Sequence, residues 1–216
     1  SRREFLAAYP ASRQLHTVIP HHIYEGLYAA IDRDDARRKL GIPADAFVTL
    51  AFGAFRHASE RKLVWRAFRR LPLAGKFLLA PRLWPYALNG SHPRGLKRFV
   101  AKTLYHAAHA VENRLRMRIT SAEELIPDAD LPAYFSAADV VFIQRTDILN
   151  SGNVPQSFAF GRVVAGPDSG DIGEMLAATG NPVFDPADPA SVDRALAEAA
   201  RLAAAGHGDK NLEYAR

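Results

Sequence analysis

The chain has 216 residues, of which 48% are hydrophobic, so it can bury a sizeable core. It contains no cysteine, which excludes a disulfide framework, a thiolate zinc site and a cysteine nucleophile. The 28 Lys and Arg residues outnumber the 23 Asp and Glu residues, and the formal charge of +5 suits anionic ligands such as nucleoside diphosphates or acidic lipids. We find no apolar run near the roughly 20 residues that span a bilayer and no motif typical of a nucleic-acid partner.

Helices and strands are predicted to alternate along most of the chain. Apolar runs such as Val140 to Ile143 are typical of buried parallel strands, and apolar residues at helical spacing predict helices between them. Ser59 is the predicted N-cap of a helix that ends near Arg70. We predict strands over 47–52, 76–80, 116–120, 140–143, 163–165 and 183–184, and helices over 34–40, 59–70, 131–138, 172–178 and 191–204. This alternation predicts an α/β fold, a Rossmann-like parallel sheet with helices on both faces.

The long connection between Pro81 and Arg116 carries apolar residues at helical spacing on one face and basic residues on the other. A crossover helix packed on the sheet, with a solvated basic face, explains this pattern. The alternative is that the basic helix near residues 94–111 contacts a membrane. Because the chain has no cysteine and its first residues lack the apolar core of a signal peptide, we expect a cytoplasmic protein. A peripheral position at the inner membrane face, through the basic helix, is the alternative.

The segment from Asp139 to Gly166 predicts a strand, a polar loop, a helix and a second strand in direct succession. Asn150, Ser151 and Gly152 supply turn residues and an N-cap at the helix start, where free N–H groups favour anions. An ordinary capped helix is the alternative interpretation. Because ligands of parallel sheets bind beyond the carboxyl ends of the strands, we expect the site at loops 53–60, 81–82, 121–127, 144–153 and 166–170.

Several blocks of sequence point to one family. Residues 52–56 read FGAFR, 131–145 read LPAYFSAADVVFIQR, 148–152 read ILNSG and 159–176 read AFGRVVAGPDSGDIGEML. With Ile19-Pro20-His21, Tyr24 and Tyr28, these blocks resemble, in the same order, the nucleotide-sugar-binding half of GT-B glycosyltransferases. The similarity is strongest to the retaining family 4 enzymes that build bacterial capsules and exopolysaccharides.

The resemblance implies that residues 1–33 are an interdomain linker-like segment and that 34–216 form the donor-binding domain, one half of a GT-B enzyme. It also implies a metal-independent hexosyltransferase, which moves a sugar from a nucleotide diphosphate sugar to a saccharide or lipid-linked acceptor. Acceptor contacts in this family come from an N-terminal domain that is absent from this chain. We therefore expect the isolated domain to bind nucleotide and to turn over little or nothing.

Arg56 matches the arginine of the family's FGxxR loop, and the resemblance implies that it holds the donor phosphates and contributes to catalysis, with Gly53 beside them. A surface arginine without a ligand is the alternative. The family places a lysine three residues further on, where this chain has Ser59. Arg61 or Lys62, in the first turn of the following helix, would have to replace it.

Two carboxylates of the wider family are absent, because their positions hold Ile148 and Gln156. The resemblance implies that the loop takes over part of their work, with Asn150 and Ser151 in catalysis and Gln156 at a ribose hydroxyl. The other loop residues expected at sugar or phosphate are Asp147, Gly152 and Asn153.

Arg145 directly follows the fourth strand, where it either faces the donor phosphates or pairs with Asp147. Asp147 is equally suited to cap or brace the loop. The nucleotide base is expected against the loop after the third strand, with Ile126 as an apolar wall.

The eight histidines form no metal-ligand pattern, so we predict no metal site, and no cofactor besides the nucleotide sugar that serves as substrate. A degenerate, non-catalytic nucleotide-sugar-binding or scaffolding module is the alternative function, because both carboxylates and the phosphate lysine are missing. A dinucleotide-dependent oxidoreductase is excluded, since it needs G-x-G-x-x-G after the first strand and Gly53 is followed by Ala54-Phe55-Arg56.

Overall fold

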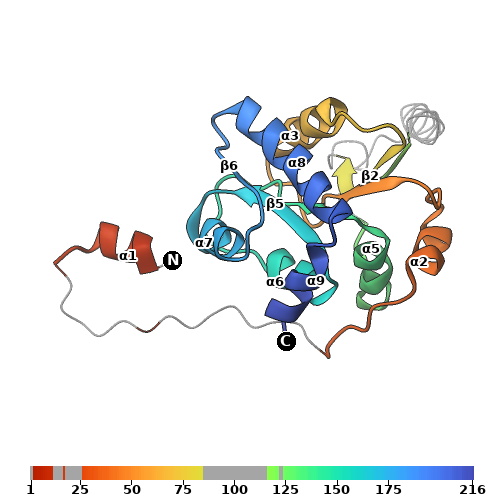
Figure 1. Ribbon diagram of the computed structural model, residues 1–216. Helices are drawn as coiled ribbons and strands as arrows, with labels where there is room; N and C mark the ends of the chain where they lie inside the picture. Colours follow the sequence, from red (N-terminus) through yellow and green to blue (C-terminus); the bar gives the residue numbers. More distant parts are fainter. Residues whose placement is uncertain (1, 12–16, 18–25, 85–115, 122–123) are drawn as a thin grey trace, which may run out of the picture.

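The computed structural model describes residues 2–11, 17, 26–84, 116–121 and 124–216 (Figure 1). The helix expected near 94–111, and the family-like residues 19–21 and 24, lie outside these ranges. None of the helices within them is long and apolar enough to cross a membrane. In chain order the elements are α1 (Arg2–Ala8), α2 (Arg33–Leu40), β1 (Phe47–Leu50), α3 (Ala58–Arg70), β2 (Lys76–Trp84), β3 (Met117–Ser121), the 3-10 helix η2 (Asp128–Asp130), α5 (Leu131–Ala137), β4 (Val140–Phe142), α6 (Asn153–Ala159), β5 (Val163–Pro167), α7 (Gly170–Ala178), β6 (Val183–Phe184), α8 (Pro189–Ala204) and α9 (Gly208–Tyr214).

The strands form one six-stranded sheet in the order β3-β2-β1-β4-β5-β6. Each strand pairs with its neighbour in parallel, which confirms the predicted Rossmann-like α/β fold, and β3 and β6 lie at the two edges. The chain builds outward from β1 to β3 on one side and from β4 to β6 on the other. Because the strand order reverses between β1 and β4, a crevice is expected at the carboxyl ends of these two strands.

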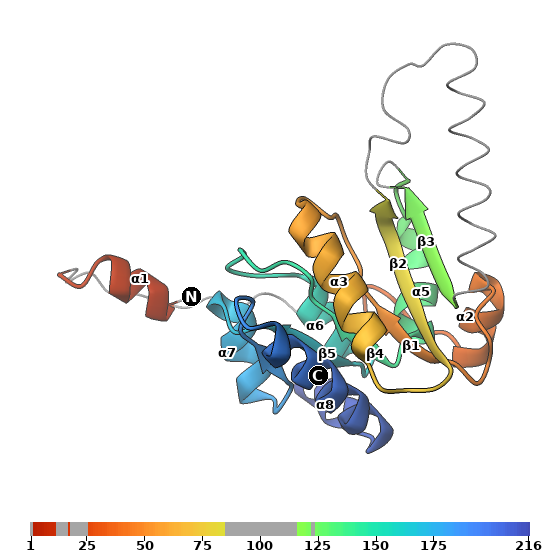
Figure 2. The same cartoon turned by 90° about the horizontal axis from the view of Figure 1, so that it is seen from above.

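Helices cover both faces of the sheet, as Figures 1 and 2 show. One core cluster joins the sheet to α2, α5, α6 and α7, and the other joins it to α3 and α8. Within β4, Val141 packs in the first cluster while Val140 and Phe142 pack in the second, because side chains alternate between the faces of a strand. A strand buried on both sides therefore reads as the continuous apolar run seen in the sequence.

Two strand boundaries near the crevice differ from the prediction. β1 ends at Leu50 rather than Phe52, because the chain turns into a loop in which Gly53 has a φ of +101°. β2 continues past the expected end at Ala80 to Trp84, and its register against β3 shifts between these two residues. The ends of both strands are thus irregular where the crevice opens.

The predicted N-cap of α3 is wrong: the cap is His57, and Ser59 lies inside the helix. The physical reason is Glu60, whose carboxylate accepts the N–H of Arg56 at 2.6 Å and the N–H of His57 at 3.3 Å. This side chain already satisfies backbone donors at the helix start, so the helix begins without the Ser59 hydroxyl.

Helix α9 follows α8, which the sequence predicts as the terminal helix. Its anchor is Asn211, a fully buried residue that donates to the Arg162 carbonyl at 2.9 Å and exchanges hydrogen bonds with Asn181. A helix held by a buried amide carries little hydrophobic periodicity, which explains why it was missed.

Contacts with the folded body begin before residue 34. Tyr28 packs against the first core cluster, and the Ile31 N–H donates to Ser136 Oγ at 3.1 Å. The division into a linker-like segment 1–33 and a domain 34–216 stays a prediction.

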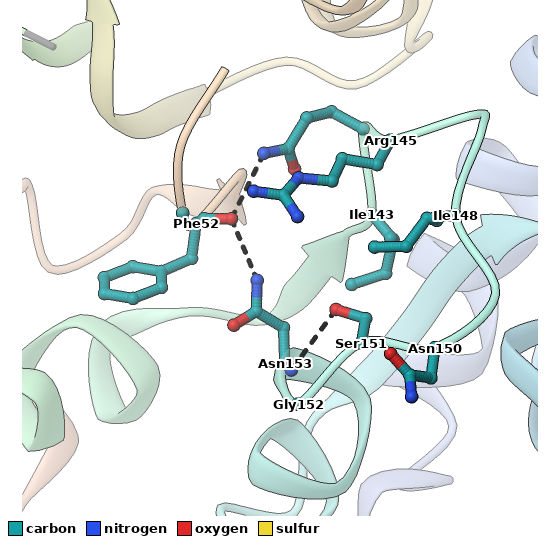
Figure 3. A pocket seen from close by; sticks show the side chains of 10 residues that line it. Phe52, Ile143, Arg145, Ile148, Asn150, Ser151, Gly152 and Asn153 are labelled. Atoms are coloured by element: carbon teal, nitrogen blue, oxygen red, sulfur yellow. Dashed lines mark hydrogen bonds between the residues drawn. The ribbon is translucent and has the colours of Figure 1, made fainter. Parts of the chain in front are cut away.

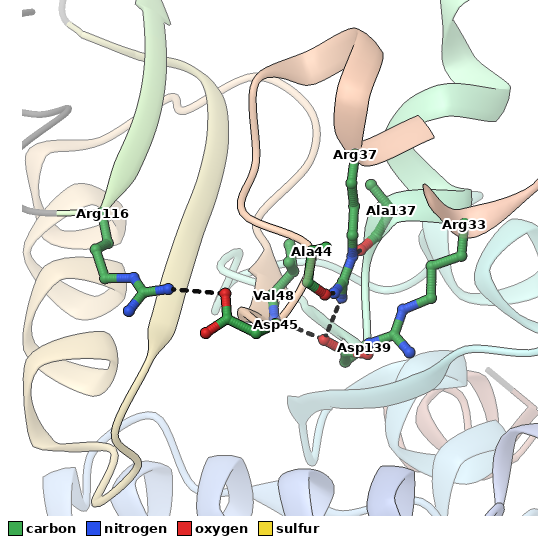
Figure 4. A network of polar contacts seen from close by, with 8 residues as sticks. All are labelled: Arg33, Arg37, Ala44, Asp45, Val48, Arg116, Ala137 and Asp139. Atoms are coloured by element: carbon green, nitrogen blue, oxygen red, sulfur yellow. Dashed lines mark hydrogen bonds and ion pairs between the residues drawn. The ribbon is translucent and has the colours of Figure 1, made fainter. Parts of the chain in front are cut away.

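Asp139 organises a polar network at the amino ends of β1 and β4, shown in Figure 4. Its carboxylate accepts the Val48 N–H at 2.7 Å and pairs with Arg37 at 2.8 Å and with Arg33 at 2.5 Å. The Arg37 side chain is 2% exposed and donates to two backbone carbonyls as well. Burial lowers the pKa of Arg37, and the Asp139 carboxylate opposes that shift. Burial also lowers the pKa of Arg162, which lies near the same carboxylate, so three arginines share the Asp139 charge at this edge of the sheet.

Candidate functional site

Two adjoining pockets open at the carboxyl edge of the sheet, and both include Phe52 and Gly53. The first has a volume of about 280 Å³ and the second about 230 Å³. The first is lined by Phe52, Gly53, Ile143, Gln144, Arg145, Ile148, Asn150, Ser151, Gly152 and Asn153. The second is lined by Phe52, Gly53, Pro81, Arg82, Leu125, Ile126, Asp128 and Leu131. One extended ligand can therefore occupy both pockets across the shared residues.

The Phe52 carbonyl ties together the three segments that meet at the first pocket (Figure 3). It accepts Nδ2 of Asn153, from the start of α6, at 2.9 Å and Nε2 of Gln144, from the end of β4, at 3.2 Å. A Cβ at Gly53 would lie 3.4 Å from Asn153 Nδ2, and the φ of +101° there favours glycine. Asn153 and Gln144 thus brace the loop after β1, and Gly53 lets the chain pass close to them.

The start of α6 presents backbone donors to the first pocket. Ser151 Oγ accepts the Asn153 N–H at 3.3 Å, and Gly152, the N-cap, has no side chain to cap the helix. The N–H groups of Ser151 and Gly152 donate to no other group in the part of the chain that the structure describes. Because α6 has only 7 residues, its dipole is small, so local N–H groups and nearby cations would do most of the anion binding.

Arginine side chains concentrate positive charge at the first pocket. Arg145 lines it and donates from Nη2 to the Ala54 carbonyl at 3.4 Å. Burial is the main cause that lowers the pKa of Arg145, repulsion from Arg56 and Arg82 lowers it further, and Glu60 opposes the shift. The Glu60 carboxylate is also held by two backbone N–H groups. The pocket therefore has positive charge that an anion would neutralise.

The second pocket combines apolar walls with one acidic side chain. Leu125, Ile126 and Leu131 provide the apolar surface, and Asp128 is the carboxylate. Arg82 enters this pocket from β2 with a φ of +68°, and its N–H donates to Thr120 Oγ1 at 3.0 Å. This conformation falls where the β2–β3 register shifts, as is usual for a bulge that redirects a side chain.

The predicted site residues divide into two groups in the structure. Gly53, Arg145 and the run Asn150–Asn153 come together on the first pocket, and Ile126 lines the second, as expected for a loop after the third strand. Arg56 is exposed and close enough to Arg145 to lower its pKa, without lining either pocket. Arg61 and Lys62 lie in the first turns of α3 and line neither pocket. Whether these residues bind phosphate stays a prediction.

Asp147 and Gln156 lie away from the two pockets. Asp147 is exposed and forms no ion pair with Arg145, which contacts the Ala54 carbonyl instead. Gln156 is 7% exposed, and its buried Nε2 has no hydrogen-bond partner among the described groups. Ile148, which replaces a family carboxylate, does line the first pocket.

The loops predicted at the carboxyl edge contain much of the second pocket, since Pro81 and Arg82 lie in loop 81–82 and Leu125 lies with Ile126 in loop 121–127. Asp128 lies outside the predicted loops, and no motif marks it as a site residue. Within the described ranges no three His, Asp or Glu side chains are grouped closely enough to hold a metal ion, and the metal-free mechanism stays a prediction.

No protein-family model and no curated protein matches the sequence. Solved structures do match the fold. Sucrose-phosphate synthase from Thermosynechococcus elongatus superimposes with a TM-score of 0.64 and 18% identity, over 99% of this chain and 51% of that one. HepE from Anabaena, in complex with UDP and glucose, superimposes with a TM-score of 0.56 and 15% identity, over 87% of this chain and 51% of HepE. The C-terminal domain of LpcC, a group 1 glycosyl transferase from Francisella tularensis, superimposes with a TM-score of 0.52 and 14% identity, over 83% of this chain and 91% of that domain.

The chain has the fold of one half of a GT-B glycosyltransferase. It spans about half the length of the synthase and of HepE, but most of the LpcC domain, which is a C-terminal domain. Identities of 14–18% establish the fold and not the activity. In this GT-B half-fold the first pocket lies at the switch between β1 and β4, the position where open parallel sheets bind ligands. The second pocket adjoins it at the ends of β1, β2 and β3.

Proposed function

We propose that this chain is the donor-binding half of a glycosyltransferase. Its ligand would be a nucleotide diphosphate sugar, and the sugar would pass with retention to a saccharide or lipid-linked acceptor held by the other half of a GT-B enzyme. The observation that carries the proposal is the pair of adjoining pockets at the carboxyl edge of the sheet. One is polar and cationic and lies at the β1–β4 switch, and the other has apolar walls and lies at the ends of β1, β2 and β3. A nucleoside diphosphate has the matching parts, an anionic group joined to a flat base.

The diphosphate is assigned to the first pocket. There the Arg145 guanidinium and the N–H groups of Ser151 and Gly152 offer donors from two sides, and Arg56 adds charge from the rim. As the glycosidic bond breaks, negative charge grows on the leaving diphosphate. Donors that are already oriented toward this charge favour the transition state more than the ground state.

The nucleoside is assigned to the second pocket. Leu125 and Ile126 supply an apolar wall for the base, and the Asp128 carboxylate can accept a hydrogen bond from a ribose hydroxyl or a base N–H. HepE, whose structure holds UDP and glucose, shares this fold and supports a nucleotide of this type.

A non-catalytic nucleotide-sugar-binding module is the second candidate. The observation in its favour is that no carboxylate lines the first pocket, since Ile148 and the buried Gln156 stand where the resemblance implies two glutamates. Such a module would bind the donor and transfer nothing. Turnover by a protein that contains both halves separates the two candidates.

Binding is tested by calorimetry with UDP, GDP, ADP, TDP and CMP, followed by the sugar conjugate of the best ligand. We expect one nucleotide to bind weakly, with a Kd on the order of 0.1–1 mM, because one half of the cleft forgoes the contacts of the other. Crystals soaked with that nucleotide should show it between loop 53–60 and the start of α6. Nucleotide density elsewhere on the chain, or no binding by any of the five, would refute the proposal.

A further inference from the structure

The turn between β5 and α7 is hydrogen-bonded to the loop that precedes α6. The Asp171 N–H donates to the Leu149 carbonyl at 2.7 Å, and the Ser169 hydroxyl donates to the Ile148 carbonyl at 3.1 Å. Two successive carbonyls of the loop are therefore held from outside it. The next residue along the chain is Asn150, which lines the first pocket.

Gly170 allows this contact. A Cβ at this position would lie 2.3 Å from the Leu149 carbonyl oxygen and 2.7 Å from Leu149 Cα, distances that side-chain carbon atoms essentially never show. Its φ of +54° is also a conformation that L side chains rarely adopt. Any larger residue would have to push the Leu149 backbone away.

Ser169 provides an independent observation. It is the N-cap residue of α7, where a serine side chain usually accepts a backbone N–H of its own helix. Here the hydroxyl makes no such bond and donates to the Ile148 carbonyl instead. The helix forgoes its own cap, and the hydroxyl holds the neighbouring loop.

Few side chains anchor the loop. Leu149 is 59% exposed, and Asp147 and Asn150 are exposed as well, whereas Ile148 packs against the first core cluster. The short helix α6 begins only at Asn153. Besides the Ile148 side chain, the contacts with the start of α7 therefore hold the backbone of the segment between β4 and α6.

We propose that Ser169 and Gly170 are positioning residues, which hold Ile148 and Leu149 so that Asn150, Ser151 and Gly152 face the first pocket. This inference rests on the proposed function, because it assigns the diphosphate to that pocket. The two residues touch no ligand themselves. They act by fixing the backbone donors before the ligand arrives, which lowers the ordering that binding would otherwise require.

The test compares Gly170→Ala with Gly180→Ala. Gly180 follows the other end of α7 with a φ of +70°, and a Cβ there would lie 3.4 Å from His207 Cε1, so it carries similar backbone strain without touching the loop. We expect Gly170→Ala to weaken binding of the best nucleoside diphosphate by about tenfold or more, since small misplacements of a site have large effects. Gly180→Ala should bind as the parent does, and the free nucleoside should be unaffected by either change.

Ser169→Ala and Ser169→Thr form a second, milder pair. Alanine removes the bond to the Ile148 carbonyl and should weaken diphosphate binding several-fold, whereas threonine keeps the hydroxyl and should restore it. If Gly170 were only needed for folding, Gly170→Ala and Gly180→Ala would both have lower melting temperatures, and Gly170→Ala would not weaken diphosphate binding more than nucleoside binding.

Hydrogen exchange tests the inference without any ligand. Amide exchange over residues 150–153 should rise in Gly170→Ala and stay at the parent level in Gly180→Ala. If the parent binds no nucleotide, the proposed function fails, and the exchange data still decide whether the turn positions the loop. Equal diphosphate affinity and equal exchange in Gly170→Ala and the parent would overturn the inference.

Discussion

The two edges of the sheet use arginine in opposite ways. At the amino edge, the buried Arg37 pairs directly with the Asp139 carboxylate and donates to two backbone carbonyls, although Arg33 and Arg162 share that carboxylate. At the carboxyl edge, Arg145 is also partly buried but is surrounded by the charges of Arg56 and Arg82, with Glu60 as the opposing carboxylate.

This difference separates a structural charge from a functional one. A buried ion pair with satisfied hydrogen bonds holds elements together and offers nothing to a ligand. A group of like charges in a pocket costs stability in the free protein, and an anion that enters relieves that cost. Changes at the amino edge should therefore affect folding, and changes at the carboxyl edge should affect binding.

The largest effect on stability is expected for Asp139→Asn. The substitution leaves the Arg37 guanidinium buried without its counter-charge, which should lower the free energy of unfolding by about 3–5 kcal/mol. Urea denaturation measures this change. Glu198→Gln, which removes the partner of Arg201 on the surface of α8, is the matched control and should leave stability nearly unchanged. If Asp139→Asn were as stable as the parent, the charges at the amino edge would not be needed for folding, and the proposed difference between the two edges would be wrong.

The largest effect on binding is expected for Gly152→Val. Gly152 has a φ of −60°, which valine can adopt, so the fold should survive while the branched side chain fills the space of the phosphate. Donor binding should be lost, whereas Asn150→Ala, which removes one polar contact, should only weaken it. Calorimetry and thermal melting check both variants. Parent-like binding and melting of Gly152→Val would show that residues 148–152 are only a capped turn and that the donor phosphates do not bind there.

A smaller effect is expected for Arg56→Ala. The loss of one charge-assisted hydrogen bond should weaken diphosphate binding by about 1.5–3 kcal/mol and leave stability unchanged, because Arg56 is exposed. Uridine or guanosine should bind as before. Arg69→Ala, at the far end of α3, is the control for the loss of a surface arginine. Equal losses for nucleoside and diphosphate would show that Arg56 does not recognise phosphate.

The smallest effect is expected for Glu60→Gln, which should change stability and diphosphate affinity at the same time. Glu60 is buried, so loss of its negative charge near the start of α3 should lower stability by about 1–2 kcal/mol. Diphosphate affinity should rise modestly, because Glu60 no longer offsets the arginines. A decrease in affinity would mean that Glu60 orders Arg56 more than it neutralises it.

The amino-acid pattern was informative where local rules decide the structure. The continuous run Val140 to Ile143 predicted a buried central strand, and the alternation of strands and helices predicted the parallel sheet. Ile126 was expected near the base pocket, and it lines the second pocket. The predicted start of α3 is wrong, because Ser59 is a suitable N-cap residue while Glu60 allows an earlier start by accepting the N–H groups of Arg56 and His57, and the sequence does not show which start is used.

The sequence by itself determined where the apolar strands lie along the chain and which glycines and polar residues follow them. From these it also predicted the edge of the sheet at which a ligand is expected. The reason is that burial and turn formation depend on residues close together in the chain. Only the tertiary structure decided which arginines are compensated, since Asp139 meets Arg33 and Arg37 from about a hundred residues away. The same holds for the contact of Gly170 with Leu149, because the close approach of two backbones depends on packing across the sheet and has no counterpart in local sequence.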